Sequence, residues 1–161
     1  MPWFTAQAMA ENPRIAHIAI DNPIGSDWAP DWISDFTGEK PAREFIAAID
    51  ALGELDEIHI ELNCPGGDVA SGVRIYNYLK NHRAKVHTKV TGMAASIAVT
   101  IMMAGDTRTM GVGTTVMTHR ASSLMVGFYN AKEMQETAAN LTKFDDAIVD
   151  VFVGVTGKTT E

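Results

Sequence analysis

The stretch Glu57-Ile58-His59-Ile60-Glu61-Leu62-Asn63-Cys64-Pro65-Gly66-Gly67-Asp68 carries the chain from a strand into a tight turn. Apolar residues occupy every second position from 58 to 62, which predicts a half-buried strand over 57–62. Beyond the Pro-Gly-Gly turn, Val69, Val73, Tyr76 and Leu79 recur at helical spacing. A strand that passes through a turn into a helix is the building unit of an α/β fold with a parallel sheet.

The same alternation continues on both sides of this stretch. Further strands are predicted at 14–20, 86–90, 107–110 and 115–118, and further helices at 41–52, 96–104 and 130–155. The segment 21–39, which contains Trp28 and Trp32, is rich in aspartate, proline and glycine and predicts a loop. Strand–helix–strand units connect by right-handed crossovers, so we expect a largely parallel sheet followed by a long C-terminal helix. No internal repeat or linker interrupts residues 1–161, and a single domain is expected.

Composition excludes several classes of protein. With 161 residues, 46% hydrophobic and 20% charged, the chain is expected to build one real core and is neither disordered nor fibrous. The formal charge of -7 disfavours binding to nucleic acid or to an anionic membrane surface. The longest uncharged run, 90–105, is too short for a membrane span. A single cysteine and the lack of a signal-peptide pattern at the start favour a reducing, cytoplasmic location.

Three segments at predicted strand ends carry groups suited to nucleophilic catalysis. The glycine turn can offer backbone N–H groups to an oxyanion. Ser96 stands among small residues in Gly92-Met93-Ala94-Ala95-Ser96-Ile97-Ala98, and His119 closes Met117-Thr118-His119. Because functional loops gather at the carboxyl ends of parallel strands, we expect the three segments to meet. A serine with a histidine base and oxyanion donors is the pattern of a serine peptidase.

The order of these motifs resembles the Clp-type serine peptidases (ClpP-like), and within them the bacteriophage prohead, or head-maturation, branch. The resemblance covers residues 15–161, nearly the whole chain. It rests on the Asn-x-Pro-Gly-Gly-Asp turn, Ile75-Tyr76-Asn77, Gly-Met-Ala-Ala-Ser, Met102-x-Ala-Gly-Asp106, Met117-x-His119 and Thr156-Gly157. Each motif alone is weak, whereas their order and spacing together are specific.

The resemblance implies a role for each residue of the site. Ser96 is expected to be the nucleophile and His119 the general base. Gly67 and Ile97 are expected to donate the backbone N–H groups of the oxyanion hole, and Gly66 to shape the turn. No metal and no organic cofactor is implied.

The resemblance also implies an architecture and a biological role. The expected fold is the crotonase-like α/β fold of ClpP, built from repeated ββα and βαβ units. The expected activity is that of a serine endopeptidase, ATP-independent or ATPase-assisted, which cleaves capsid or scaffold proteins during phage maturation. A homo-oligomeric ring is expected, with the long helix contributing to the interface.

The acid of the triad is where this sequence departs from the family pattern. The family's Asp or Glu follows the Thr-Gly pair at residues 156–157 further along the chain, which places it beyond Glu161. The chain is therefore expected to be truncated before its catalytic acid and to be a weak peptidase. Asp145, Asp146 and Asp150 are alternatives if the long helix passes His119, although a solvated or interface face explains them more simply.

The same residues allow other interpretations. Ser96 alone could cap a helix or fill a small space, and His119 alone could be a hydrogen-bonded residue at a strand end. An acyl-CoA hydratase or isomerase of the same fold would also use backbone N–H groups, but would need a carboxylate base near the glycine turn. A non-catalytic shell or scaffold component is the third alternative.

The remaining polar residues have structural interpretations. Cys64 is expected to be a packing residue, Asp68 to cap the helix that begins at Val69, and Asp106 to serve a turn. The four other histidines are expected in strands or at a helix end, and no pair of them has metal-ligand spacing along the sequence. They are His17, His59, His82 and His87.

Overall fold

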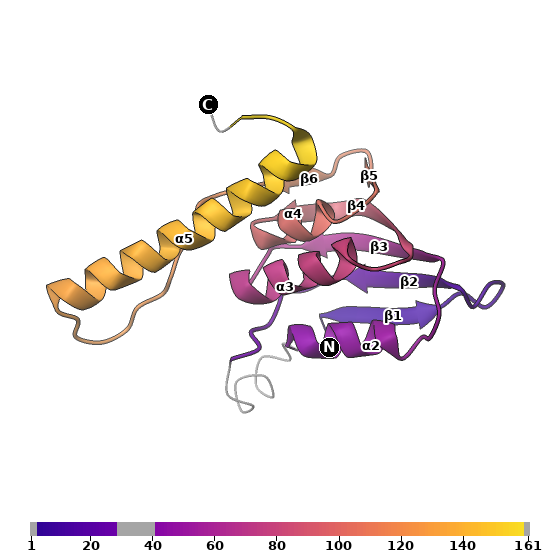
Figure 1. Ribbon diagram of the computed structural model, residues 1–161, viewed down its shortest axis with the longest axis horizontal. Coiled ribbons are helices and arrows are strands. Elements are labelled where there is room, and N and C mark those ends of the chain that lie inside the picture. The colour runs from indigo at the N-terminus through magenta and orange to yellow at the C-terminus, as the bar shows by residue number, and fades with distance from the viewer. Residues whose placement is uncertain (1–2, 29–40, 160–161) are drawn as a thin grey trace. The chain divides into compact units, whose positions relative to one another are not determined.

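The computed structural model describes residues 3–28 and 41–159 of the chain (Figure 1). It divides into two compact units, residues 1–118 and residues 119–161. The expected loop at 21–39 lies largely outside the described residues, and Trp32 with it. Trp28, at the end of the described part of that loop, is 84% exposed. In the described residues no helix has the length and apolar character needed to cross a membrane.

A six-stranded mixed sheet forms the centre of the first unit. Its strands are β1 (Phe4–Ala8), β2 (Ile15–Ile20), β3 (Glu57–Cys64), β4 (Lys85–Ala95), β5 (Thr107–Met110) and β6 (Thr115–Met117). The first pair, β1 and β2, is antiparallel, whereas β2, β3, β4 and β5 run parallel to one another. The short strands β5 and β6 lie one after the other along the same strand, β4. The predicted parallel sheet is confirmed.

Two strands differ from the prediction. The strand β1 was missed because its side chains pointing to one face, Phe4, Ala6 and Ala8, include two alanines, which give almost no hydrophobic alternation. The strand β4 was predicted to end at Val90 but continues to Ala95. Its last residues are small and have weak strand propensity, so they are held in the sheet by pairing with β3 and β6.

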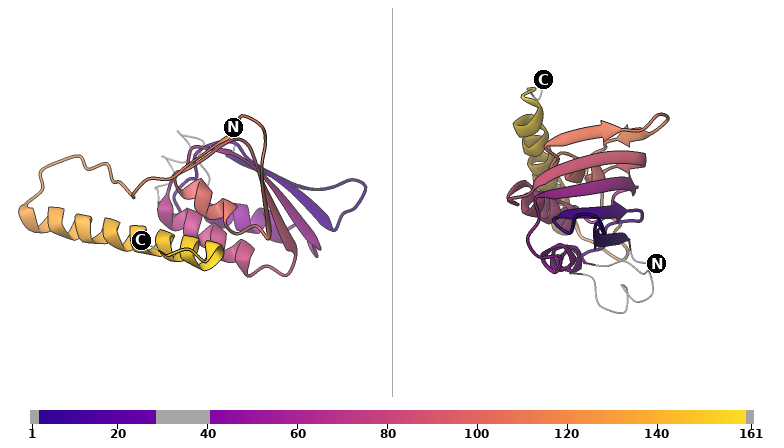
Figure 2. Two further views of the ribbon diagram at one scale, coloured as in Figure 1. Left: turned by 90° about the horizontal axis from the view of Figure 1, so that it is seen from above. Right: turned by 90° about the vertical axis from the view of Figure 1, so that its right-hand side faces the viewer.

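Three helices of this unit, α2 (Ala42–Asp50), α3 (Val69–Lys80) and α4 (Ile97–Met102), cover one face of the sheet (Figure 2). They confirm the helices predicted at these places. Asp68 caps α3 as expected, because its carboxylate accepts a 2.8 Å hydrogen bond from the Ser71 N–H. The Asp106 carboxylate stabilises the turn before β5, as expected, because it accepts a 2.9 Å hydrogen bond from the Val86 N–H.

The core lies between these helices and the sheet. Along β2, β3 and the first part of β4, up to Val90, every second residue is buried, and the residues between them are half-buried or exposed on the opposite face. Trp3 closes the end of the core near β1, with its ring stacked on that of Phe45 at a centroid distance of 5.5 Å. The largest buried side chains are Trp3, Phe45, Ile18, Ile20, Ile24, Ile49, Leu55, Ile58, Ile60, Leu62, Ile75 and Leu79.

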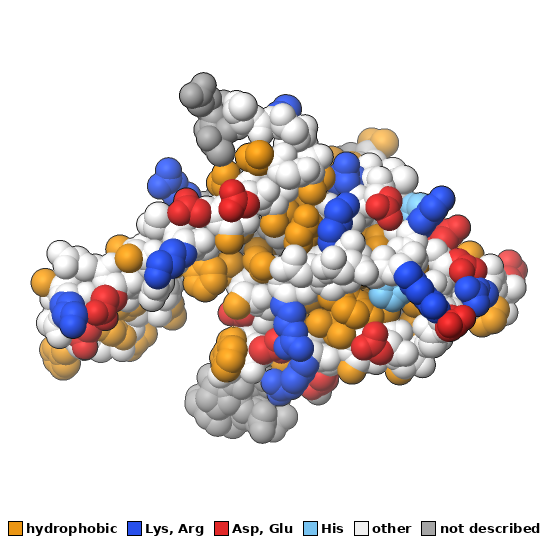
Figure 3. All heavy atoms as spheres, viewed as in Figure 1, with side chains coloured by type: hydrophobic (Ala, Val, Ile, Leu, Met, Phe, Trp, Pro, Cys, Tyr) orange, Lys and Arg blue, Asp and Glu red, His pale blue; other side chains and the backbone are white. Residues whose placement is uncertain are grey.

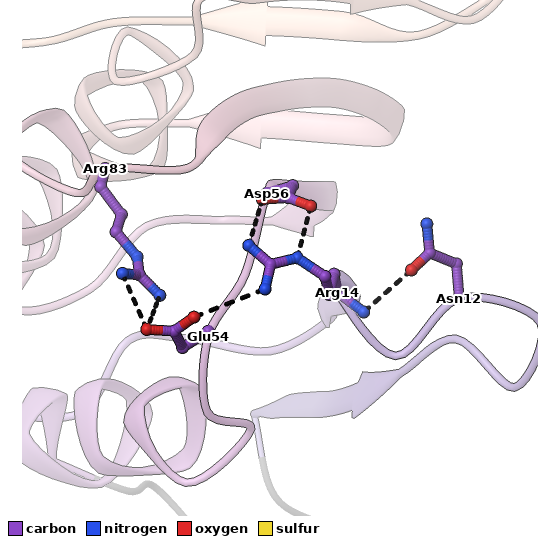
Figure 4. Close-up of polar contacts among 5 residues, drawn as sticks. All are labelled: Asn12, Arg14, Glu54, Asp56 and Arg83. Atoms are coloured by element: carbon purple, nitrogen blue, oxygen red, sulfur yellow. Dashed lines mark hydrogen bonds and ion pairs between the residues drawn. The ribbon is translucent and has the colours of Figure 1, made fainter.

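Ion pairs join the segments that lead into β2, β3 and β4 (Figure 4). Arg14 binds the Asp56 carboxylate through two hydrogen bonds of 2.6 Å and contacts Glu54 at 3.4 Å. Arg83 contacts the same Glu54 at 3.2 Å. All of these groups are exposed, and Figure 3 shows acidic and basic side chains interleaved at this end of the unit. The Arg14 guanidinium lowers the pKa of Asp56, and Arg83 is the main cause of a lowered pKa at Glu54.

The second unit consists of an extended segment and one long helix, α5 (Ala131–Thr156). The helix begins at a capping box in which Asn130 and Glu133 bind each other's backbone N–H groups. It ends at Gly157, whose φ of 66° and hydrogen bond to the Val153 carbonyl form a left-handed cap. No residue of α5 is buried, and Figure 3 shows hydrophobic side chains along its visible face. The helix predicted at 130–155 is confirmed.

Candidate active site

Ser96 stands at the point where β4 passes into α4. Its backbone has φ 56° and ψ -129°, and it is the one non-glycine residue with positive φ in the part of the chain that the structure describes. Two hydrogen bonds hold this conformation: the Ser96 N–H donates to the Met117 carbonyl at 2.8 Å, and the Ser96 carbonyl accepts from the Val99 N–H at 3.1 Å. A strained backbone fixed on both sides is typical of residues with a functional role.

The side chain of Ser96 does not act as a helix cap. Although Ser96 occupies the cap position of α4, its hydroxyl makes no capping hydrogen bond. The residue is half-buried, between the buried Ala95 and the buried Ile97. The structural interpretation of this serine as a cap is therefore wrong, and its hydroxyl is left for another role.

The glycine turn after β3 approaches Ser96 directly. A Cβ atom added to Gly66 would lie 2.6 Å from the Ser96 Cβ, 3.2 Å from its Oγ and 2.9 Å from the Ala95 carbonyl oxygen. The backbone of Gly66 also has a φ of 110°, a conformation that favours glycine. Only glycine fits here, because the Ser96 side chain and the Ala95 carbonyl occupy the space that a side chain at residue 66 would need.

The neighbouring Gly67 is held from the other side by Ile24. The Ile24 N–H donates to the Gly66 carbonyl at 2.8 Å, and the Asp68 N–H donates to the Ile24 carbonyl at 2.9 Å. These bonds use the groups on either side of Gly67, whose own N–H has no hydrogen bond to a described residue. A side chain at Gly67, where φ is 141°, would overlap the Ile24 backbone. This bridge of two hydrogen bonds between Ile24 and the turn thus fixes the turn and leaves the Gly67 N–H group available.

Two backbone N–H groups therefore flank the contact between the turn and the serine. One belongs to Gly67, which follows Gly66, and the other to Ile97, which follows Ser96. As the first residue of α4, Ile97 has an N–H group without a partner inside the helix. Free N–H groups beside a serine hydroxyl have the chemistry of an oxyanion hole.

Cys64 lies under the same turn. It is fully buried, and its Sγ atom accepts a hydrogen bond from the Gly66 N–H at 3.4 Å. Burial raises the pKa of its thiol to about 11, so the neutral form dominates near neutral pH. The interpretation of Cys64 as a packing residue agrees with this environment, because a reactive cysteine needs a lowered pKa.

The remaining candidate residues belong to the second unit, which His119 opens. His119 is exposed and follows Met117 by two residues along the chain. In the same unit, the Asp145 carboxylate accepts a 2.6 Å hydrogen bond from the Ala121 N–H, two residues beyond His119. The structure thus brings Gly66, Gly67, Ser96 and Ile97 together in the first unit.

Sequence reasoning missed the part played by Ile24. This residue belongs to a segment expected to be an irregular loop, and its partner Gly67 is far away along the chain. A lone isoleucine among prolines and aspartates was the one available signal, because an apolar residue in a polar loop needs a place to be buried.

Comparison with known proteins agrees with this geometry. Residues 32–161 match the family model described as Clp protease. The chain is 32% identical over 106 residues to the ATP-dependent Clp protease proteolytic subunit of Deinococcus radiodurans, covering 65% of this chain and 51% of the relative. The corresponding subunit of Atropa belladonna is 34% identical over 109 residues, covering 65% of this chain and 54% of the relative. The chain spans about half the length of the curated relatives it matches.

A solved structure of a ClpP1 variant from Listeria monocytogenes is similar in fold, with a TM-score of 0.66 at 21% identity. The similarity covers 91% of this chain and 74% of the other. It confirms the predicted ClpP-like α/β fold with its C-terminal helix. The comparisons identify the family and no branch within it.

Proposed function

Because the chain belongs to the Clp protease family, we propose that it is a serine endopeptidase whose nucleophile is Ser96. The observation that carries the proposal is the backbone of Ser96, which is held at positive φ with its side chain against the Gly66 turn. This arrangement presents a hydroxyl without a capping role beside two free N–H groups. A serine at a sharp strand-to-helix turn is the arrangement of a nucleophile elbow.

The proposed reaction proceeds through an acyl-enzyme. The Ser96 Oγ attacks the carbonyl carbon of the scissile peptide bond while His119 takes the hydroxyl proton. The N–H groups of Gly67 and Ile97 stabilise the oxyanion of the tetrahedral intermediate. The intermediate collapses when the C–N bond breaks and His119 gives the proton to the leaving amine. A water molecule, activated by the same histidine, then hydrolyses the ester and restores Ser96.

The chain connection supports the pairing of Ser96 with His119. The carbonyl of Met117 is hydrogen-bonded to the Ser96 N–H, and two residues of extended chain span about 7 Å. As in the resemblance described above, the triad acid is proposed to follow Thr156-Gly157.

The proposal extends to the substrate and to the assembly of the protein. The curated relatives are named proteolytic subunits of an ATP-dependent protease, which supports a polypeptide substrate and an oligomeric assembly. The resemblance to the prohead branch supports a capsid or scaffold protein as the substrate, cleaved with or without the help of an ATPase. The single cysteine, Cys64, supports a reducing, cytoplasmic site of action.

A serine-directed fluorophosphonate probe tests the nucleophile. The unchanged protein is expected to be labelled at one position, and Ser96→Ala should abolish the labelling. Ser122→Ala is the matched control, because Ser122 is an exposed serine of the second unit. Labelling that survives in Ser96→Ala would refute the assignment. A protein that resists the probe and binds acyl-CoA would instead be a hydratase or isomerase, and one that does neither would be a shell component.

A further inference from the structure

The face of the sheet opposite the helices carries a row of polar side chains across neighbouring strands. The register pairs His17 of β2 with His59 of β3, His59 with His87 of β4, and His87 with Thr107 of β5. Adjacent strands are about 4.8 Å apart, so side chains in register on one face are neighbours. The rings of His59 and His87 have a centroid distance of 4.8 Å. Neither histidine has a part in the proposed peptidase chemistry.

Glu57 adds a carboxylate to two of these histidines. It precedes His59 by two positions and therefore lies on the same face of β3. Its Oε2 atom is 2.7 Å from the Nε2 of His59 and 3.7 Å from the Nε2 of His87. The three side chains are half-buried, and one ligand atom from each lies within 4.8 Å of the others. Spacing along the sequence could not show this cluster, because its members come from two strands.

The ring of His87 is held in one orientation. Its Nδ1 atom is 2.7 Å from the hydroxyl oxygen of Thr107, which fixes the plane of the ring. In the tautomer that donates from Nδ1 to Thr107, the lone pair of Nε2 points toward the Glu57 carboxylate, and both groups can then bind one cation. Histidines that bind metals almost always donate their other ring N–H to such a partner.

The donor set indicates which kind of cation fits. Two imidazole nitrogens and one carboxylate oxygen suit zinc and related transition ions, whereas magnesium and calcium prefer oxygen ligands alone. In a tetrahedral site with ligands about 2.1 Å from zinc, the ligand atoms are about 3.4 Å apart. The distances of 2.7 and 3.7 Å from Glu57 lie on either side of this value, and side-chain rotations would bring the three ligand atoms around one ion. A fourth position is left for water.

In the described residues no lysine or arginine forms an ion pair with Glu57, whose hydrogen-bond partner is the neighbouring His59 of the cluster. Lys89 pairs with Glu61 at 3.5 Å, and the His17 Nε2 lies 3.8 Å from the same carboxylate. Lys85 stands in register with Glu57 and is exposed, so its charge weakens cation binding without blocking the site. A cavity of about 230 Å³ lies beside the cluster, and its lining includes His59, His87 and Thr107 but not Glu57.

We propose that Glu57, His59 and His87 form a binding site for a divalent transition metal ion of the zinc class. The ion links β3 to β4. The contact between His87 and Thr107 extends this link to β5. The β3–β4 pairing ends near Ser96, and the metal site lies seven residues before that end, which is roughly 20 Å along the strands. It also lies on the face of the sheet away from the helices. Metal binding and acylation of Ser96 are therefore separable.

The test uses the untagged full chain, freed of metal by a chelator and titrated with zinc chloride in a calorimeter. We expect one equivalent to bind with an affinity in the micromolar range, and His59→Gln/His87→Gln to weaken binding by about 10²-fold or more. His17→Gln is the matched control, because His17 shares the face and the row but not the cluster. It should change the affinity less than about twofold.

Cobalt(II) provides a second measurement. Its visible spectrum should show a tetrahedral site with nitrogen and oxygen ligands and no sulfur-to-metal charge transfer, which excludes Cys64. Unchanged zinc binding in the double variant, thiolate ligation in the cobalt spectrum, or no zinc binding by the unchanged protein would overturn the proposal. Circular dichroism checks that the double variant is folded. Fluorophosphonate labelling of Ser96, which the double variant should retain, reports on the peptidase proposal separately.

Discussion

The hydroxyl of Ser96 lies against the backbone of Gly66, so closely that a methyl group on Gly66 would come within 3.2 Å of the Oγ atom and 2.6 Å of the Cβ atom. The proposed nucleophile and the turn beside it are thus shaped to each other. The space above Gly66 is filled by the serine itself, and the position of the hydroxyl depends on the absence of a side chain there.

We expect Gly66→Ala to slow fluorophosphonate labelling of Ser96 by about 10²-fold or more, because the new methyl group displaces both the serine and the adjacent N–H group of Gly67, the proposed oxyanion donor. The rate of labelling at fixed probe concentration measures the effect. Gly53→Ala is the control, because Gly53 also has a positive φ, 81°, but no atom within 4 Å of an added Cβ. Equal labelling rates in the two variants would show that the close approach has no influence on the nucleophile.

The thiol of Cys64 should resist alkylation in the folded protein. Its pKa of about 11 leaves far less thiolate at pH 8 than an unfolded cysteine has with a pKa of about 8.5. We expect iodoacetamide to react about 10²-fold more slowly with the native protein than with the protein in denaturant, as measured by mass spectrometry. Rapid alkylation of the native protein would contradict the packing role.

The raised pKa of Cys64 also makes the stability of the folded protein depend on pH. Because the folded-state pKa lies above the unfolded one, the stabilising contribution is complete below about pH 8.5 and is lost as pH rises toward about 11. Cys64→Ala should therefore remove part of the decrease in melting temperature over this range. Identical alkaline profiles for the variant and the unchanged protein would rule this contribution out.

The hydrogen bond between Asp145 and the Ala121 N–H predicts a positioning role in the segment that follows His119. Asp145→Ala should slow labelling of Ser96 by about 10-fold, because the segment loses its anchor on α5. Asp145→Asn keeps an acceptor oxygen and should remain within a fewfold of the unchanged protein. A loss of about 10⁴-fold in the Asn variant would instead identify Asp145 as the triad acid. Asp146→Ala, at the exposed neighbouring position, is the control.

The ion pairs around Arg14 predict a pH-dependent stability. Arg14 lowers the pKa of Asp56, so its contribution is present above the unfolded-state pKa of about 4 and is lost as pH falls further. We expect Arg14→Gln to lower the melting temperature slightly at pH 7 and to make no difference well below pH 4. Arg43→Gln is the control, because the Arg43 guanidinium contacts a backbone carbonyl, that of Asp27. A difference that persists in acid would exclude the ion pair as its cause.

The sequence was sufficient to predict the elements in which hydrophobic periodicity is strong. The alternation of Ile58, Ile60 and Leu62 predicted β3, and the capping residue Asp68 predicted the start of α3. The last part of β4 and the strand β1 were not predicted, because alanine and glycine carry little periodic signal. Pairing with neighbouring strands decides these segments, and such pairing is not visible in a local window of sequence.

In the candidate site, too, local features could be predicted from the sequence and contacts between distant segments could not. Ser96 and the glycine turn were found from small residues at strand ends, and the structure brings them into contact. Two features depend on distant segments and could not be found in this way: the bridge from Ile24 to Gly67, and the cluster of Glu57 with His59 and His87. Each joins residues that no motif connects, so tertiary structure was needed to see them.

The bridge between Ile24 and Gly67 has a consequence for where the working protein begins. The family model matches from residue 32 onward, and every sequence motif of the site lies within that match. The residue that holds Gly67 in place lies before it. A shortened protein starting at residue 32 would keep every motif of the candidate site and lose the residue that fixes the proposed oxyanion donor, Gly67. The candidate site therefore depends on more of this chain than its motifs define, and any transplant of the site to another scaffold has to carry a substitute for Ile24.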